Sequence, residues 1–537
     1  MGGRLNFDLL IEKPKGSPLV EEYLNGASGG ARFYSGSWRE SAAFAAVMDA
    51  VDGRFDRDRR RQALECVRPS AAVPQARLDE WIERGGLMVT TGQQPGLFGG
   101  PLYSLYKGLT AVRLAARLEI VLERPVLPVF WVASEDHDWA EADHTYLIDK
   151  SNELVRLQVD DPDHGERAFH RIPLEKELER AVEAVVQVLP TTDFSGPYVE
   201  LLRDSYRPGS TLADGFSGLM GGLLEPLGVL FADAAGDALK KASAPVLLEE
   251  LDNAEAHEQL LKANASEIEG AGFSTQVPIL HGGVNLFLEG PRGRERLYRN
   301  EEGFELHRSG EIVSSEEVRD RSGRDPRSLS PNVLLRPIVE SSVFPVVSYV
   351  AGPGEMAYYA QIGPLYEAHG LKMPVIFPRH SVTVVEAKIR KKLDKFGLDV
   401  ESLHRPQHEV VSELARQEMP DEVRRALGEL RGAIGSGAGR LMKAAVSIDA
   451  TLSGPVTRAR NAALAGLQDV ERKIVQSVKR ENEIALRQVE AAQRHLFPEG
   501  KPQERILNPL YYLTRYGNSF IEALVEGFEV DLPDTTE

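Results

Sequence analysis

Continuous apolar runs, each ended by a glycine-rich turn, mark the middle of the chain. Residues 87–91 form one such run, and Gly-Gln-Gln-Pro-Gly at 92–96 ends it. Residues 109–118 then carry apolar side chains at helical spacing, and residues 126–132 form a second continuous run. Runs without polar alternation are typical of strands buried on both faces of a parallel sheet. The pattern predicts a β-α-β unit in this region.

A second unit of the same kind lies much further along the chain. Residues 344–350 run into a glycine turn at 351–355, a helix is predicted up to His369, and an apolar strand follows at 374–378. Residues 228–233 are predicted as another strand of the same sheet. The sequence thus predicts an α/β fold whose parallel sheet is assembled from separated pieces. Residues near 152–205 and 245–335 would be insertions.

The remaining segments give weaker patterns. The first eighty residues are predicted as helices and loops, with a helix at 38–50 and a solvated charged face at 54–61. The second insertion is predicted to be β-rich, from apolar runs at 277–280 and 284–288 and the Gly-Pro-Arg-Gly turn that follows. The polar, proline-punctuated stretch at 314–332 is predicted as a long loop.

From residue 384 onward the pattern becomes helical. Apolar residues at spacings of 3, 7, 4 and 7 fit a heptad seam, which Glu471 and Glu481 interrupt. The seam is long enough for an antiparallel hairpin or a dimer arm, with Gly435-Ser-Gly-Ala-Gly439 as a break. An amphipathic helix packed on its own domain is the alternative. The seam residues are Leu464, Leu467, Ile474, Val478 and Ala485.

Composition narrows the class of protein. The 537 residues contain 63 Lys and Arg against 81 Asp and Glu, a formal charge of −18, which argues against broad nucleic-acid binding. Cys66 is the only cysteine, so an internal disulfide and a cysteine-rich zinc site are excluded, and we interpret it as structural or incidental. We expect no signal peptide and no membrane-spanning helix, and a cytoplasmic location.

The turn after the first strand is a candidate binding site. Ligands of open parallel sheets bind beyond the carboxyl ends of the strands. Glycine allows close approach of the backbone, and the following helix offers free N–H groups to an anion. Polar side chains accompany the turn. The candidates here are Gly92, Gln93, Gln94, Gly96, Tyr103 and Lys107.

An acidic, histidine-containing loop follows the second strand. Glu135-Asp136-His137-Asp138 is followed by Glu141, Asp143 and His144. These groups could act as a general base, bind a cationic amino group or hold a metal, although the spacing matches neither a zinc helix nor a calcium loop. A solvated acidic loop is the structural alternative.

Two further strand ends carry functional residue types. Gly352-Pro-Gly354-Glu355 permits close approach to a ligand, and Arg379 with Ser381 and Thr383 offers a cation and hydroxyls. A phosphate-binding P-loop, a complete dinucleotide fingerprint and a nucleophile elbow are all absent from the sequence.

Four strings in this order resemble one family. They are Thr-Thr-Gly-Gln-Gln-Pro-Gly-Leu-Phe-Gly-Gly-Pro-Leu-Tyr-Ser-Leu-Tyr-Lys (90–107), Val-Phe-Trp-Val-Ala-Ser-Glu-Asp-His-Asp (129–138), Ala-Gly-Pro-Gly-Glu-Met-Ala-Tyr (351–358) and Pro-Gln-Glu-Arg-Ile-Leu-Asn-Pro-Leu-Tyr (502–511). Together they resemble the bacillithiol biosynthesis cysteine-adding enzymes, the BshC family. The resemblance extends over essentially the whole chain.

The resemblance implies a fold and domain plan. The fold is a Rossmann-like, nucleotidylyl transferase-like core with two connecting-peptide insertions and a C-terminal coiled coil that forms a homodimer. The predicted boundaries are 1–151, 206–244 and 336–385 for the core, 152–205 and 245–335 for the insertions, 386–500 for the coiled coil and 501–537 for a segment packing back near the core. The His-x-Gly-His and Lys-Met-Ser-Lys-Ser signatures of related cores are missing.

The resemblance also implies an activity. It is a ligase that adds L-cysteine to glucosaminyl malate in the last step of synthesis of bacillithiol, a low-molecular-weight thiol. We expect ATP or ADP, with Mg²⁺, to be the associated cofactors and expect no zinc and no resident metal. Whether ATP is consumed or a nucleotide is only structural stays open. The acceptor could be a related amino sugar conjugate.

Residue type and place suggest roles within this activity. His137, aided by Asp136 or Asp138, would take a proton from the attacking amine, and Glu135 or Glu355 would anchor an ammonium group. Arg336 or Arg379 would bind the carboxylates of malate. Candidate nucleotide contacts are Ser381, Val382, Thr383, Gln503, Glu504, Arg505 and Asn508.

Two other functions remain as alternatives. One is a tRNA-linked or nucleotidylyl-transferring enzyme on the same core, for which residues 386–395 are locally basic. The other is a non-catalytic scaffold in which the coiled coil is the function. The overall acidity and the missing signatures argue against the first, and polar residues maintained at buried strand ends argue against the second.

Overall fold

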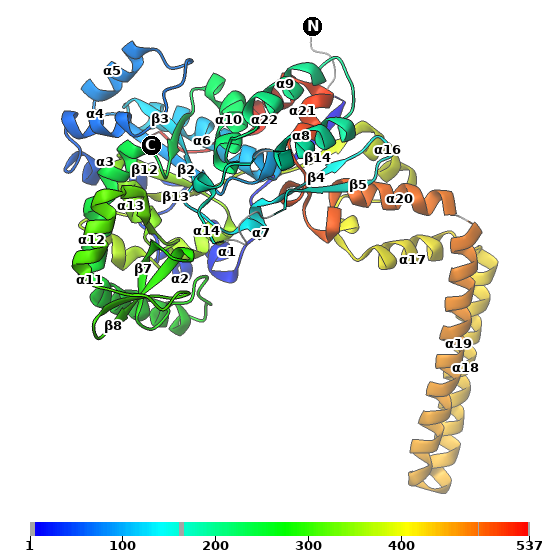
Figure 1. Ribbon diagram of the computed structural model, residues 1–537. Coiled ribbons are helices and arrows are strands. Elements are labelled where there is room, and N and C mark those ends of the chain that lie inside the picture. Colours follow the sequence, from blue (N-terminus) through cyan, green and yellow to red (C-terminus); the bar gives the residue numbers. More distant parts are fainter. Residues whose placement is uncertain (1–5, 161–165, 175, 482, 535–537) are drawn as a thin grey trace. The chain divides into compact units, whose positions relative to one another are not determined.

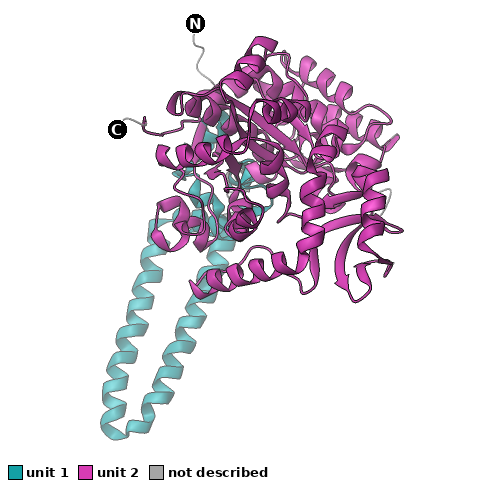
Figure 2. Cartoon of the chain, turned by 90° about the vertical axis from the view of Figure 1, so that its left-hand side faces the viewer, with its two compact units in different colours: residues 1–8, 384–503 teal, residues 9–383, 504–537 magenta. Residues whose placement is uncertain are grey.

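A computed structural model describes residues 6–160, 166–174, 176–481 and 483–534. The chain divides into two compact units, coloured separately in Figure 2. The larger consists of residues 9–383 and 504–537, and the smaller of residues 1–8 and 384–503. The chain crosses between them within β1 (Phe7–Glu12), within β14 (Ser381–Glu386) and after residue 503.

A five-stranded parallel sheet forms the centre of the larger unit (Figure 1). Its order is β13-β12-β2-β3-β6, and every neighbouring pair is parallel. The strands are β2 (Leu87–Gln93), β3 (Val126–Val132), β6 (Leu230–Asp233), β12 (Val346–Ala351) and β13 (Val375–Pro378). All residues of β3 and β12 are buried, as their continuous apolar runs predicted. The predicted α/β class and all five predicted strands are confirmed.

Helices connect the strands of each predicted β-α-β unit. α6 (Leu102–Val121) links β2 to β3, and α14 (Pro353–Tyr359) and α15 (Gly363–Ala368) link β12 to β13. Pro101 precedes α6 and Pro353 begins α14, where the missing proline N–H has no helical partner to lose. Both connections begin at a carboxyl strand end, so the glycine turns lie at that edge of the sheet.

The N-terminal residues are mostly helical, with one strand that the sequence did not predict. β1 carries residues 7–12, and the helices are α1 (Pro18–Asn25), α2 (Ser28–Ala31), α3 (Ser41–Asp52), α4 (Arg57–Glu65) and α5 (Gln75–Glu83). The predicted helix at 38–50 begins three residues later. The charged segment 54–61 is not entirely a solvated face, because Arg60 is buried and donates to the carbonyl of Gly86 and to Asp52.

A mixed segment separates β3 from β6. It contains α7 (Trp139–Ala142), an antiparallel pair formed by β4 (His144–Ile148) and β5 (Leu154–Gln158), and then α8 (Lys176–Val188), α9 (Ser195–Ser205) and α10 (Leu212–Leu224). Thr211 and Asp214 form a capping box at the start of α10.

A second, antiparallel sheet follows the long helix α11 (Asp237–Gly270). Its order is β10-β9-β8-β7-β11, with strands β7 (Gly283–Gly290), β8 (Gly293–Asn300), β9 (Gly303–Leu306), β10 (Ile312–Val313) and β11 (Leu329–Pro331). The predicted β-rich character is confirmed, although residues 277–280 are not in a strand. The loop predicted at 314–332 is wrong: it contains α12 (Ser315–Arg324), whose first turn is capped by the Ser314 side chain. α13 (Arg336–Val343) leads into β12.

The smaller unit is predominantly helical. It contains α16 (Ala387–Phe396), α17 (Gln407–Gln417), α18 (Asp421–Ile448), α19 (Ser453–Glu481) and α20 (Glu483–Leu496). α18 and α19 lie side by side as an antiparallel hairpin (Figures 1 and 2). The break predicted at 435–439 is wrong, because α18 continues through these glycines and the chain turns at Asp449.

The predicted heptad seam faces the hairpin partner in part. Leu467 and Val478 are buried, and Leu464 and Ile474 are half-buried. Glu471 is tolerated because it accepts a hydrogen bond from Arg431 of α18 at 2.7 Å. The side chains of Glu481 and Ala485 lie outside the described residues.

The last helices return to the larger unit. They are α21 (Leu510–Tyr516) and α22 (Asn518–Gly527), and Arg113 of α6 donates to the carbonyl of Phe528 just beyond them. Within the described ranges, no helix combines the length and apolarity needed to cross a membrane.

Candidate functional site

The parallel sheet brings four of the candidate strand ends to one edge. The turn after β2 and the loop after β3 are joined by a hydrogen bond of 3.0 Å from the Ala133 N–H to the Gln93 carbonyl. The end of β13 is joined to that of β12 by a 2.9 Å bond from the Arg379 N–H to the Ala351 carbonyl. Ligands of open sheets bind at such an edge.

A hydrogen-bonded group of four side chains occupies the centre of this edge. We call Gln94, Asp136, His137 and Arg294 the His137 cluster. Gln94 Nε2 donates to Asp136 Oδ2 at 2.6 Å, so the glutamine turn and the acidic loop meet directly. Asp136 Oδ1 accepts from the backbone N–H groups of His137 at 2.6 Å and of Asp138 at 3.1 Å. Asp138 itself is exposed.

Arg294 enters the cluster from β8 of the second sheet. Its Nη1 lies 3.0 Å from His137 Nδ1, and its guanidinium stacks on the Phe287 ring, 3.9 Å from the ring centre. It also donates to Ser330 Oγ and to the carbonyl of Pro331, both at 2.9 Å. These three bonds go to neutral acceptors, so the charge of Arg294 is balanced only through space.

The cluster shifts the protonation of its members. Burial, followed by the charge of Arg294, lowers the pKa of His137 to about 4, so this imidazole is neutral near pH 7. Burial opposes ionisation of Asp136, but Arg294 and the hydrogen bonds from Gln94 and the backbone hold its pKa below the ordinary value. For Glu141, burial and the nearby Asp138 and Asp136 raise the pKa.

A second group surrounds Lys107 beside β2 and β12. Lys107 Nζ lies 2.5 Å from Glu355 Oε2, 2.7 Å from the Gly92 carbonyl and 3.0 Å from Gln93 Oε1. Glu355 also accepts from the Tyr349 hydroxyl at 2.6 Å and from the Gly352 N–H at 2.7 Å. The buried ammonium and the half-buried carboxylate thus neutralise each other.

Two glycines near this site leave little space for a side chain. A Cβ at Gly352 would lie 3.3 Å from Glu355 Oε2 and 3.6 Å from Arg379 Nε, and a Cβ at Gly96 would lie only 2.9 Å from the Cα of Gly100. Gly354, by contrast, has open space around its Cβ position. Tyr103 also belongs to the group around Lys107, because its hydroxyl accepts a hydrogen bond from Gln93 Nε2 at 3.3 Å.

Several charged candidates already have internal partners. Arg379 forms a double hydrogen bond with Glu504, at 2.9 and 2.6 Å, and Arg336 Nη1 lies 3.0 Å from Glu340. Glu135 is buried and lies 2.5 Å from Lys240 Nζ. The role of ammonium anchor predicted for Glu135 or Glu355 is therefore not supported, because each carboxylate already holds a lysine of this chain.

Most residues predicted to contact a nucleotide instead form hydrogen bonds within the chain. Asn508 Nδ2 donates to the carbonyls of Phe98 and Gly100 and to Thr145 Oγ1, and Gln503 bonds both backbone groups of Val384. Glu504 holds Arg379 and accepts from the Val382 N–H at 3.1 Å. These buried side chains have structural roles. Ser381 and Thr383 are half-buried on β14, and Arg505 is exposed.

In the acidic loop, as far as the structure describes it, no three ligand-type side chains bring their ligand atoms together. Among the described residues, Glu250, His257 and His369 are the one group of three or more ligand-type side chains with converging atoms, and they lie outside this loop. His144 Nδ1 instead lies 2.7 Å from Asp143 Oδ1. Cys66 is buried and free, and burial together with Glu65 raises its thiol pKa to about 11, which agrees with a structural interpretation.

Sequence reasoning missed the partners that determine these charges. Arg294, Lys240, Glu340 and Tyr349 come from segments interpreted only as insertion, helix or buried strand. The alternation of arginines at 292, 294 and 296 was the one available signal, because alternate residues of a strand share a face.

Fold and site together define an α/β enzyme with a Rossmann-like core and a coiled-coil domain. Two family models match the chain: "Bacillithiol biosynthesis BshC, N-terminal Rossmann-like domain" over residues 8–380, and "Bacillithiol biosynthesis BshC, C-terminal coiled-coil domain" over residues 382–531. The chain therefore belongs to the BshC family.

Curated relatives agree with this family over nearly their full length. A protein of Salinibacter ruber is 31% identical over 526 residues, covering 96% of this chain and 94% of its own. Proteins of Koribacter versatilis and Geobacillus thermodenitrificans are 29% and 27% identical, each with 96% of both chains covered. All three bear the name "Putative cysteine ligase BshC".

Proposed function

We propose that this chain joins L-cysteine to glucosaminyl malate through an amide bond, as the last step of bacillithiol biosynthesis. Membership of the BshC family and the printed name of its relatives support ligase chemistry. The observation that carries the proposal is the Gln94–Asp136 hydrogen bond of 2.6 Å, which joins two strand ends into one polar site. A cytoplasmic location goes with it, since the single thiol needs no oxidising compartment.

The carboxylates around Gln94 are suited to bind the acceptor amine and to take its proton. Asp136 is ionised at neutral pH and attracts an ammonium group, while Glu141 has a raised pKa that suits it to accept a proton. Gln94 donates a hydrogen bond to Asp136 and also interacts with Glu141, so it positions both carboxylates. We therefore assign proton acceptance to Glu141.

His137 is given a different role from the one its residue type suggests. Its Nδ1 faces the Arg294 guanidinium, which can only donate, so the proton of the neutral ring is on Nε2. A ring in this state donates a hydrogen bond and is a poor base. His137 is suited to bind a carboxylate or carbonyl oxygen of a substrate.

The anionic end of the acceptor needs a cation that is not already hydrogen-bonded to a carboxylate. Arg379 and Lys107 are each paired with a carboxylate, and Arg336 with Glu340, whereas the hydrogen bonds of Arg294 go to neutral groups. Arg294 is therefore our candidate for the malate carboxylates, together with His137. The role of the bonds among Lys107, Glu355 and Gly92 is structural: they hold the turn after β2 beside β12.

Activation of cysteine requires a further reactant. An amide does not form from a carboxylate and an amine in water without activation, and we propose ATP with Mg²⁺ as its source. The buried amides and carboxylate of Gln503, Glu504 and Asn508 do not fit a nucleotide, because their polar atoms bond within the chain. We assign no nucleotide contact to them.

A homodimer formed through the coiled coil is the second part of the proposal. The α18–α19 hairpin has an apolar hollow of about 590 Å³. Leu430 and Val470 beside it are 51% and 50% exposed. Exposed apolar surface of this kind favours a protein partner, and a second copy of the hairpin offers a matching surface.

One incubation tests the function. Purified protein is mixed with L-cysteine and glucosaminyl malate, with and without ATP and Mg²⁺, and the amide product is measured by mass spectrometry. We expect product only when ATP is present. Product without ATP would keep the ligase and contradict the activation step, and tight binding of bulk tRNA in a parallel filter assay would favour the nucleotidylyl transferase alternative.

A further inference from the structure

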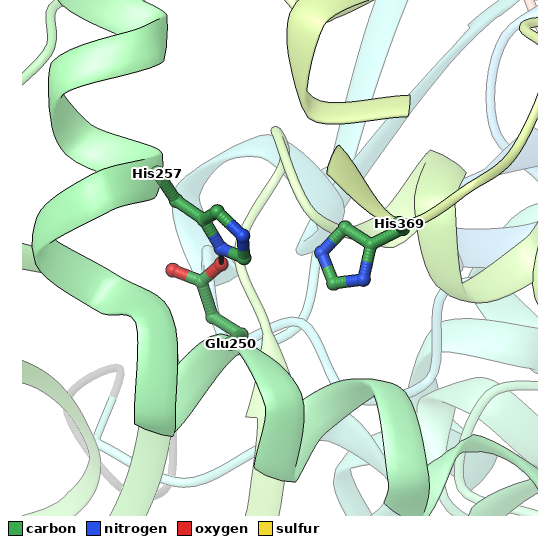
Figure 3. Close-up of side chains that lie close together, drawn as sticks. All are labelled: Glu250, His257 and His369. Atoms are coloured by element: carbon green, nitrogen blue, oxygen red, sulfur yellow. Dashed lines mark hydrogen bonds and ion pairs between the residues drawn. The ribbon is translucent and has the colours of Figure 1, made fainter. Parts of the chain in front are cut away.

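A buried group of two histidines and a glutamate lies away from the strand ends. Glu250 and His257 belong to α11, and His369 follows α15 (Figure 3). One ligand atom of each lies within 4.8 Å of the others, and all three residues are buried. A non-helical residue, Asn253, interrupts α11 between Glu250 and His257.

A carboxylate lies beside each imidazole ring. Glu250 Oε2 forms a 2.6 Å hydrogen bond with His257 Nδ1, and Glu249 Oε2 lies 3.1 Å from His369 Nδ1. The bond at His257 Nδ1 favours a proton on that nitrogen and leaves a lone pair on His257 Nε2. Figure 3 shows the two rings turned toward each other, and their centres are 4.9 Å apart.

Both ring nitrogens of His369 lack a hydrogen-bond partner among the described residues, and the side chain is only 1% exposed. A buried polar atom without a partner is costly and rare. In Figure 3, His369 Nε2 points toward His257 and Glu250, which indicates that a ligand belongs between the three side chains.

The glutamate adds a charge that its neighbours balance poorly. Glu250 is fully buried, and Oε1 accepts from the backbone and side-chain N–H groups of Asn285, at 3.1 and 2.9 Å. Asn285 is neutral. A buried carboxylate flanked by neutral groups and imidazoles is favourable when a cation neutralises it.

We propose that Glu250, His257 and His369 bind one divalent transition-metal ion of the zinc class. Two imidazole nitrogens and a carboxylate oxygen form a ligand set suited to Zn²⁺, whereas Mg²⁺ and Ca²⁺ prefer oxygen ligands. The site needs no cysteine, which is why the single Cys66 gave no indication of it. It also differs from the sequence-based expectation of no zinc.

The position gives the ion a structural role. His369 precedes β13, so it lies at the amino end of that strand, whereas Arg379 follows its carboxyl end. The ion would fasten α11 to the connection that leads into β13. The inference is independent of the ligase reaction, and removal of the ion is expected to lower stability.

Metal content of the full chain tests the site. Protein stripped with a chelator and dialysed is titrated with Zn²⁺, and bound metal is measured by mass spectrometry after gel filtration. A parallel titration with Co²⁺ reports the ligand set through its visible absorption. We expect one equivalent of tightly bound Zn²⁺ and a rise in the melting temperature on loading.

Variants separate this site from adventitious binding. His369→Gln and Glu250→Gln should each weaken Zn²⁺ binding more than about tenfold and remove the Co²⁺ absorption. His281→Gln is the matched control, because its side chain is 93% exposed and lies on the same insertion. Glu250→Gln keeps an acceptor for Asn285 and so is the variant most expected to fold.

Two results would overturn the proposal. One is a wild-type protein that retains less than a stoichiometric amount of metal after gel filtration. The other is Zn²⁺ binding that is equally strong in His369→Gln, Glu250→Gln and His281→Gln. In either case the three side chains form a buried polar network without an ion.

Discussion

At the residue scale, the immediate partners of each charged side chain decide what it is available to do. Glu135 and Asp136 are neighbours in the sequence, yet Glu135 is buried against Lys240 while Asp136 lies in the His137 cluster. Arg379 and Arg294 are both arginines near the same edge, but only Arg379 is locked to a carboxylate. We therefore propose Asp136, Glu141, His137 and Arg294 as the residues that contact the substrates.

The buried Arg379–Glu504 pair should contribute to stability. Glu504→Gln leaves a buried guanidinium without its counter-charge, which costs about 3 kcal/mol or more in the free energy of unfolding. Glu183→Gln is the control, because Glu183 forms an equally direct pair with Arg203 on the exposed surface, where the cost is within about 1 kcal/mol. Chemical denaturation measures both. Equal losses would contradict the structural role of Glu504.

His137 should make stability depend on pH. Its folded pKa of about 4 lies below the ordinary value of 6.5, so the unfolded chain binds a proton first as pH falls. Its contribution is present above pH 6.5 and is lost between pH 6.5 and about 4, by up to about 1.4 kcal/mol per pH unit.

Removal of the ring isolates this contribution. The free energy of unfolding of His137→Gln should fall less steeply than that of the wild type between pH 6.5 and 5. The pH–rate profiles of the wild type and of His137→Gln should have the same shape near pH 6.5, because His137 does not ionise there. Parallel stability slopes would mean that His137 is not held neutral by burial and Arg294.

At the element scale, continuous apolar runs were the most informative signal. Strands buried on both faces are predominantly apolar, so β2, β3, β12 and β13 could be predicted from their sequence alone. Their parallel order then placed the glutamine turn beside the acidic loop. The partners Arg294 and Lys240 could not be predicted, because their contacts depend on tertiary packing.

Predictions from local composition were wrong in two segments, where helix capping or helix packing determines the structure. The polar segment 314–332 contains α12, since Ser314 caps it and Glu316 and Glu317 favour its first turn. α18 continues through Gly435, Gly437 and Gly439, because packing against α19 outweighs the low helix propensity of glycine. The short strand β1, near the N-terminus, was not predicted.

The exposed apolar face of the hairpin should hold two copies together. Leu430→Glu combined with Val470→Glu places charge on this face, and the dimer should dissociate to the 59.2 kDa chain. Light scattering after gel filtration measures the mass. Ile120→Glu is the control, since Ile120 is an exposed apolar residue of α6 in the larger unit. A monomeric wild type, or a double variant that remains dimeric, would contradict assembly through the hairpin.

At the scale of the whole molecule, the chain combines a sheet edge suited to small polar substrates with an acidic surface and a coiled coil. The formal charge of −18 disfavours nucleic acid as a partner. The strand ends provide carboxylates and amides, and β8 adds Arg294, whose side-chain hydrogen bonds go to neutral groups. Such a site fits two small, charged metabolites better than a polymer. The strand ends are therefore the proposed ligase site.

Comparison of wild type with Gln94→Ala in the amide-forming reaction tests this claim most directly. Gln94 fixes Asp136 without belonging to the buried core, so the variant should fold with an unchanged melting temperature and lose at least about a hundredfold in the rate of product formation. Gln75→Ala, which removes an exposed amide that donates to Asp79 in the same unit, should keep its rate. An unchanged rate in folded Gln94→Ala would place the ligase chemistry elsewhere in the chain.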